Sequence, residues 1–272
     1  MDSQELCRMA FSPQSSPVYG GKTIVVAFAD ENSLPKEKEI FLVFEGSASR
    51  HITSVNRLNA FTLQAVIPGH DRSEVVQLSV CLFHDNQHIV VAQGKFEFME
   101  DPVQIFAAWL LDSVHDANAL DKDETIIQNS GFDFCAEDKS ILDVQLASAF
   151  ENLTIPHSWS IVGDTSRLEQ EPPPRETLLH FAARQGFSQF AMLLLNKPGS
   201  DVSLRLPNKH GEFPRDIARE RGLDSLVDTM HEYTGDSSPE CENRSRSYRK
   251  HCIGTATVTN KVMVESNTEI GK

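Results

Sequence analysis

The sequence lacks the motifs that would predict catalysis, a cofactor or a metal site. Its five cysteines are an odd number and form no CxxC pair, and its ten histidines include no HExxH motif. Neither a GxxxxGK[ST] phosphate loop nor a GxSxG nucleophile motif is present. We therefore expect reduced thiols, no cofactor, no bound metal and no enzymatic activity.

Long apolar runs and positive charge are also scarce. No run approaches the roughly 18 apolar residues that a membrane helix needs, and the first residues carry acids where a secretory signal carries Lys or Arg. The formal net charge of -14 argues against nucleic acid or an anionic membrane as the main partner. We expect a cytoplasmic protein whose partners are other proteins.

The first part of the chain has the pattern of a β domain. Residues 1–16 are polar and predict a disordered leader, whereas residues 17–100 contain short segments rich in Val, Ile and Phe, separated by turn signals. This spacing predicts an immunoglobulin-like β-sandwich, with another six- or seven-stranded β fold as the alternative. The expected strands are 23–28, 40–45, 61–67, 74–83, 88–93 and 95–100.

At Asp101 the apolar period changes from two to helical, so we predict a helical connector over residues 101–174. Helices are expected over 102–120 and 140–153, the second capped by Ser140. An acidic loop at 121–139 and a proline-rich loop near 169–174 separate the elements. The expected apolar faces are Ile105, Phe106, Trp109, Leu110 and Val114 in the first helix, and Ile141, Val144, Leu146, Phe150 and Leu153 in the second.

An internal repeat follows the proline-rich loop. The segment 175–195 aligns with the segment after His210 at an offset of 36 residues, which places Phe181 on Ile217. Small residues would let paired helices approach, and glycines would end the first helix of each copy in the left-handed conformation. The positions with these structural roles are Thr177, His180, Ala182, Gly186, Pro214, Ala218 and Gly222.

The TLLHFAARQG segment resembles the ankyrin signature T-P-L-H-x-A and its following turn. The first copy lacks the proline, and the second has Phe213 and Asp216 in place of Thr and His. We predict two ankyrin-type repeats over 175–234, with an unrelated pair of helical hairpins as the alternative, and a disordered tail over 235–272. Two repeats need a covering partner, for which the helices of the connector and Trp159 are suitable.

A broader resemblance covers about residues 17–233. The segments PVYG, FLVFEGS, IPGHD, SWSIVG and PRETLLHFAARQG resemble the N-terminal region of Lbc-type Rho guanine-nucleotide exchange factors, which include an A-kinase-anchoring member. The resemblance implies a non-catalytic region that positions or restrains exchange activity in Rho signalling. A stand-alone inhibitor or competitor of a full-length exchange factor is the alternative, and an enzyme built on the β domain is a third.

The predicted partner-binding residues are Lys209, His210, Gly211 and Glu212, because the hairpin tips of ankyrin repeats face partners. A simple turn is the alternative. The expected partners are a Rho exchange factor or its regulators. The basic segment from Arg244 to Lys250 predicts at most weak membrane contact, and Ser245, Ser247 and Tyr248 are candidate phosphorylation sites.

Three further features favour structural roles over functional ones. The helix from Val103 to Leu120 has the apolar stripe of an anchoring helix, but it is better explained as core. His70 and His180 lack a nucleophile motif and are expected to stabilise turns. The acidic segment 120–124 is expected to be a solvated loop and not an acid/base pair.

Overall fold

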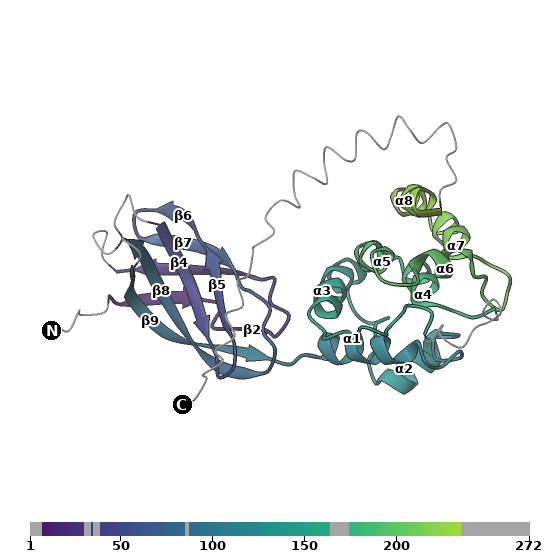
Figure 1. The fold of residues 1–272 in the computed structure, drawn as a ribbon, viewed down its shortest axis with the longest axis horizontal. Coiled ribbons are helices and arrows are strands. Elements are labelled where there is room, and N and C mark those ends of the chain that lie inside the picture. Colours follow the sequence, from purple (N-terminus) through teal and green to yellow (C-terminus); the bar gives the residue numbers. More distant parts are fainter. Residues whose placement is uncertain (1–6, 30–33, 35–38, 85–86, 164–173, 235–272) are drawn as a thin grey trace, which may run out of the picture. The chain divides into compact units, whose positions relative to one another are not determined.

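The computed structural model describes residues 7–29, 34, 39–84, 87–163 and 174–234 (Figure 1). The chain divides into two compact units, with the boundary between Asp101 and Pro102. The mixed α and β content is confirmed. The predictions for residues 1–6, for most of the proline-rich loop and for the tail from 235 onward, including the basic segment and its phosphorylation candidates, lie outside the described residues.

The first unit contains two β-sheets that share one hydrophobic core. The four-stranded sheet has the order β1-β3-β7-β6, and the five-stranded sheet has the order β2-β9-β8-β4-β5. Neighbouring strands are antiparallel except β2 and β9, which are parallel. The strands are β1 (Met9–Ser12), β2 (Ser15–Pro17), β3 (Thr23–Phe28), β4 (Glu39–Glu45), β5 (Arg50–Ser54), β6 (Asn56–Asn59), β7 (Thr62–Val66), β8 (Glu74–His84) and β9 (Gln87–Met99).

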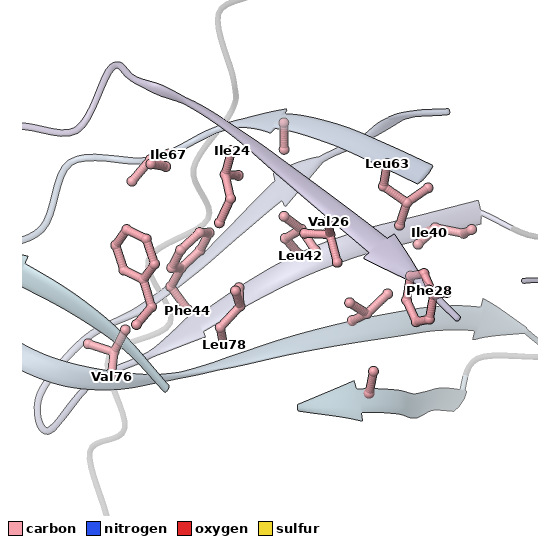
Figure 2. Close-up of a cluster of buried hydrophobic side chains, with 14 of the residues drawn as sticks. Ile24, Val26, Phe28, Ile40, Leu42, Phe44, Leu63, Ile67, Val76 and Leu78 are labelled. Atoms are coloured by element: carbon pink, nitrogen blue, oxygen red, sulfur yellow. The ribbon is translucent and has the colours of Figure 1, made fainter. Parts of the chain in front are cut away.

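Alternation along the strands decides which side chains enter this core. Ile24 and Val26 of β3 point from one sheet toward Leu42 of β4 and Leu78 of β8 in the other (Figure 2). In β8 the even-numbered residues from Val76 to Leu82 are buried in the cluster, as their period of two predicts. Burial of each such side chain stabilises the folded state by roughly 1.5–3 kcal/mol.

The prediction of a disordered leader was wrong for its second half. Residues 9–17 form β1 and β2, and β1 pairs with β3 while β2 pairs with β9. The physical reason is that Met9 and Phe11 pack against the core, where the ring of Phe11 lies 6.4 Å from that of Phe96. Segments 88–93 and 95–100, predicted as two strands, form the single strand β9. The sequence patterns also missed β5 and β6.

The second unit contains eight helices in its described residues. They are α1 (Pro102–Ser113), α2 (Asp123–Ser130), α3 (Lys139–Glu151), α4 (Leu178–Gln185), α5 (Ser188–Leu195), α6 (Ser200–Arg205), α7 (Pro214–Glu220) and α8 (Asp224–Thr234). α4 and α5 form one hairpin and α7 and α8 form another. Both helices of the second hairpin begin 36 residues after their counterparts, so the predicted pair of hairpins is confirmed.

Aromatic side chains join the first hairpin to the preceding helices. The ring of Phe181 in α4 lies 6.2 Å from that of Phe106 in α1 and 5.6 Å from that of Phe134. Phe190 in α5 lies 5.3 Å from Phe150 in α3, and all these rings are fully buried. Residues 102–163 and the two hairpins therefore belong to one compact unit and share a core.

Trp159 closes this junction, as its position in the sequence predicts. Its side chain is 5% exposed, and its indole N–H donates to the carbonyl of Leu111 at 2.9 Å. Its ring lies 5.8 Å from that of Phe150. One side chain thus ties the segment after α3 to the end of α1.

Other predictions for the connector need correction. The acidic loop 121–139 contains α2, and the first predicted helix stops at Ser113. α3 is capped by Asp138, whose side chain accepts from the N–H groups of Ser140 and Ile141, and not by Ser140. Two residues of the predicted apolar face of α3, Leu146 and Phe150, are buried as expected, but the buried face is rotated away from Ile141 and Val144. Ile141 and Val144 are 56% and 55% exposed, whereas Leu142, Leu146, Ala149 and Phe150 are buried.

Asp143 of α3 explains this rotation. Its carboxylate is buried and accepts the N–H groups of Gln189 and Phe190, both at 2.8 Å, at the start of α5. These donors have no partner within their own helix. The side chain of one helix therefore caps another, although burial raises the pKa of this carboxyl above its usual range despite the backbone donors.

We predict that Asp143→Ala lowers the free energy of unfolding of the helical unit by about 2 kcal/mol, because two buried N–H groups lose their acceptor. Urea unfolding followed by far-UV circular dichroism measures this change. Asp112→Ala, at an exposed aspartate of α1, is the matched control and should change the stability little. Equal stability of the two variants would contradict the capping role.

Candidate protein-interaction site

Thr177 and His180 hold the start of the first hairpin. The side chain of His180 is fully buried, and its Nε2–H donates to the carbonyl of Glu212 at 3.2 Å. Its Nδ1 is therefore the acceptor in the neutral ring, and it receives the backbone N–H of Thr177 at 3.2 Å. The Thr177 hydroxyl lies 2.8 Å from the same nitrogen and 2.7 Å from the hydroxyl of Ser203. The imidazole thus links α4 to the loop that precedes α7.

The other residues for which structural roles were predicted lie at helix ends or in buried positions. Gly186 and Gly222 have φ values of 82° and 70°, which confirms the left-handed conformation expected of them. Ala182 and Ala218 are both fully buried, and α4 packs against α7. Pro214 is the first residue of α7, where its missing N–H leaves no donor unpaired.

The loop from Asn208 to Glu212 contains the predicted partner-binding residues. Lys209, His210 and Gly211 are exposed, and Glu212 is half-buried. Asn208 holds this loop, because its side-chain oxygen accepts the N–H groups of His210 at 2.9 Å and Glu212 at 3.0 Å. Its side-chain amide donates to the Glu212 carboxylate at 2.9 Å. Sequence reasoning missed Asn208, although asparagine before a glycine-containing turn is a recognised signal.

The Lys209 ammonium is engaged within the chain. It donates to the side-chain oxygen of Asn118 at 2.6 Å and forms an ion pair with Asp121. These two residues lie in the connection between α1 and α2, so the pairing attaches the loop to that connection. Of the predicted residues, His210 therefore offers an exposed side chain whose backbone is already fixed.

Arg184 makes a second connection to the same region. Its guanidinium pairs with Glu176 and with Asp123 and donates to the carbonyl of Leu120 at 2.9 Å. Burial lowers the pKa of Arg184 from its ordinary value, although Asp123 opposes the shift. The carboxylates of Asp121 and Asp123 are thus held in ion pairs, which argues against an acid/base role for the segment 120–124.

A shallow groove between α3 and α5 is a second candidate surface. Val144 and Met192 line it, and they are 55% and 38% exposed. Ser148, Glu151, Gln189 and Asn196 also line the groove and contribute polar side chains. The sequence reasoning missed this groove because it placed Val144 on the buried face of α3.

In the β unit, Ser49, His70 and Glu74 are spaced like a catalytic triad, but their hydrogen bonds differ from those of a triad. The Ser49 hydroxyl lies 3.4 Å from His70 Nδ1, and His70 Nε2 lies 2.9 Å from a Glu74 oxygen. However, Ser49 donates to Asp71 at 2.8 Å, and His70 Nδ1 faces His51 Nε2 at 2.9 Å. A general base must face the hydroxyl proton that it removes, and here the proton points to Asp71.

Within the described residues, no helix combines the length and the apolar character required to cross a membrane. Cys7, Cys81 and Cys135 are free cysteines, and burial raises the pKa of the Cys81 thiol.

Comparison with known proteins relates the chain to Rho guanine nucleotide exchange factors over most of its length. The chain is 31% identical to Rho guanine nucleotide exchange factor 28 of Mus musculus and 30% identical to that of Rattus norvegicus, in each case over 232 residues, or 85% of this chain. It spans only 13% of the length of these relatives.

A shorter similarity connects the chain to an adapter protein. Over 69 residues, or 25% of this chain and 8% of the relative, it is 39% identical to the phosphoinositide 3-kinase adapter protein 1 of Homo sapiens. No protein-family model matches the chain.

The buried imidazole of His180 predicts a pH dependence of stability. Burial lowers its pKa from 6.5 to about 4, so the unfolded chain takes up a proton at a higher pH than the folded chain. The free energy of unfolding therefore has its full value above pH 6.5, where His180 is neutral in both states, and it declines as the pH falls toward 4. The decline amounts to about 3 kcal/mol.

Urea unfolding of the full chain between pH 7 and pH 4 measures this effect, with the wild type compared to His180→Gln. The variant should be less stable at neutral pH and should lose less stability on acidification. His115→Gln, at an exposed histidine of the same unit, should retain the wild-type slope. Parallel curves for wild type and His180→Gln would refute the assignment.

Proposed function

We propose that this chain is a non-catalytic protein-interaction and regulatory region that positions or restrains exchange activity in Rho signalling. The observation that carries the proposal is the extent of the similarity to Rho guanine nucleotide exchange factor 28. At 232 residues it is longer than either unit, so it includes parts of both. A cytoplasmic location accords with this role.

At the level of fold, we infer an immunoglobulin-like β-sandwich and two ankyrin-type repeats. The shared core of two sheets supports the first. The second is supported by the common offset of the hairpins, the left-handed glycines and the bond from His180 to the next loop. Repeat arrays bind partners along their loops, so this inference directs attention to the loop at 208–212.

Two surface features support recognition of a protein. The loop at 208–212 presents His210 on a backbone held by Asn208, which reduces the entropy lost on binding. The groove between α3 and α5 exposes Val144 and Met192 beside polar side chains, a combination common in protein interfaces. Because Lys209 forms an ion pair within the chain, we expect it to contribute less to partner binding than His210.

The absence of catalysis is part of the proposal. In the part of the chain that the structure describes, His180 is buried in a repeat contact, and the Ser49 proton points away from His70. A stand-alone competitor of a full-length exchange factor is the second candidate. It is favoured by the similarity itself, because a chain that resembles part of Rho guanine nucleotide exchange factor 28 could offer the same binding surfaces.

The proposal predicts direct binding to the catalytic region of a Rho guanine nucleotide exchange factor. His210→Glu should weaken this binding at least tenfold, because it places a charge at the centre of the predicted interface. His157→Glu, at an exposed residue away from the loop, is the matched control and should leave the affinity unchanged. Biolayer interferometry measures both affinities.

Nucleotide release from the Rho protein separates the two modes of action. Slower release in the presence of the chain indicates restraint, whereas binding without a change in rate indicates positioning. A chain that binds no Rho exchange factor, or that binds through a surface insensitive to His210→Glu, would count against the proposed interface.

A further inference from the structure

The β unit contains a cluster of polar side chains that takes no part in the proposed recognition. His70 and Asp71 lie in the connection between β7 and β8, and Glu74 is the first residue of β8. His51 in β5 and Ser49 before it approach from the other side. The His70 side chain is fully buried, and its ring stacks on Phe98 with centroids 4.6 Å apart.

The donor atoms of three of these residues converge. His70 Nε2 lies 2.9 Å from Glu74 Oε1 and 3.6 Å from Asp71 Oδ1. Ligands around a tetrahedral zinc ion are separated by about 3.3–3.6 Å, given metal–ligand bonds near 2.0–2.2 Å. The His70–Asp71 distance lies at this spacing, the His70–Glu74 distance is shorter, and all three ligand atoms lie within 4.8 Å of one another, so side-chain shifts would admit the ion.

The Asp71 carboxylate is oriented with one oxygen toward the imidazole, whereas the Glu74 oxygen that faces His70 also accepts the backbone N–H of Ser47 at 3.0 Å. Arg72 bonds to Asp71 Oδ2 at 2.7 Å, which leaves Oδ1 facing His70 and Ser49. Asp71 is 43% exposed and Glu74 is 18% exposed, so an ion has access from solvent. Two carboxylates supply the negative charge that a dication requires.

The surroundings of His70 provide the support that metal ligands commonly have. The other ring nitrogen, Nδ1, lies 2.9 Å from His51 Nε2 and 3.4 Å from the Ser49 hydroxyl. The backbone N–H of His70 donates to the carbonyl of Val18 at 2.6 Å and fixes the connection. A side chain at Gly46 would approach Glu74 Oε1 to 2.5 Å and His70 Cε1 to 2.8 Å, so the turn closes tightly over the cluster.

We propose that His70, Asp71 and Glu74 bind a zinc ion, with solvent completing the coordination. Without the ion, His70 Nε2–H donates to Glu74, and Nδ1 accepts from His51 Nε2–H. With the ion bound at Nε2, the His70 proton resides on Nδ1 and is donated to His51 Nε2. The His51 proton then resides on its own Nδ1, so both rings stay neutral and no net proton is released.

Isothermal titration of the full chain with Zn²⁺ tests the proposal, with Mg²⁺ and Ca²⁺ as comparison ions. We expect saturable binding of one Zn²⁺ in preference to the other two cations, because the imidazole ligand favours zinc. Glu74→Gln and Asp71→Asn preserve side-chain shape and should each weaken Zn²⁺ binding at least tenfold. His115→Gln and Cys135→Ser, which remove exposed donors of the other unit, should leave it unchanged.

Nitrogen NMR of the histidine rings provides a second readout in the same samples. Addition of Zn²⁺ should move the His70 proton from Nε2 to Nδ1. Gly46→Ala should weaken this response, because the added methyl group displaces Glu74 and His70. Absence of saturable Zn²⁺ binding would overturn the proposal. The proposal would also be overturned if the affinity for Zn²⁺ were unchanged in both carboxylate variants but lost in Cys135→Ser or His115→Gln.

Discussion

The helical unit depends on covering the outer face of its first hairpin. Phe181 packs against Phe106 and Phe134, Phe190 packs against Phe150, and all five rings are fully buried. Two helical hairpins alone would leave such faces in water. The helices of residues 102–151 therefore cover the first hairpin, and Asp143 adds a specific polar contact at the start of α5.

The same packing gives the loop surface its rigidity. His180 lies inside the unit and bonds to the carbonyl of Glu212, so the core of one hairpin fixes the loop of the next. Asn208 and the Lys209–Asp121 ion pair restrain the loop from two further directions. A loop so held would lose little conformational entropy on contact with another molecule.

Features set by local sequence were predictable. β3 coincides with the segment 23–28, and both hairpins follow the 36-residue offset. Features decided by contacts between residues far apart in the sequence were not predictable. β1 forms because Met9 and Phe11 reach the core, and α3 turns Val144 outward because Asp143 caps α5.

The candidate sites show the same division. The sequence singled out residues 209–212, but it could not show that Lys209 pairs with Asp121, 88 residues away. Nor could it bring His51 beside His70, because these residues meet only when β5 and the β7–β8 connection pack together. The three proposed zinc ligands lie within residues 70–74, whereas His51, which contacts His70, comes from a separate strand.

We propose that the loop at 208–212 of the helical unit meets another protein. Hydrogen–deuterium exchange of the full chain, with and without the catalytic region of a Rho guanine nucleotide exchange factor, tests it most directly. We predict slower exchange in the peptides that contain residues 208–212 when the partner is present. Unchanged exchange throughout the helical unit, with the partner demonstrably bound, would contradict the account.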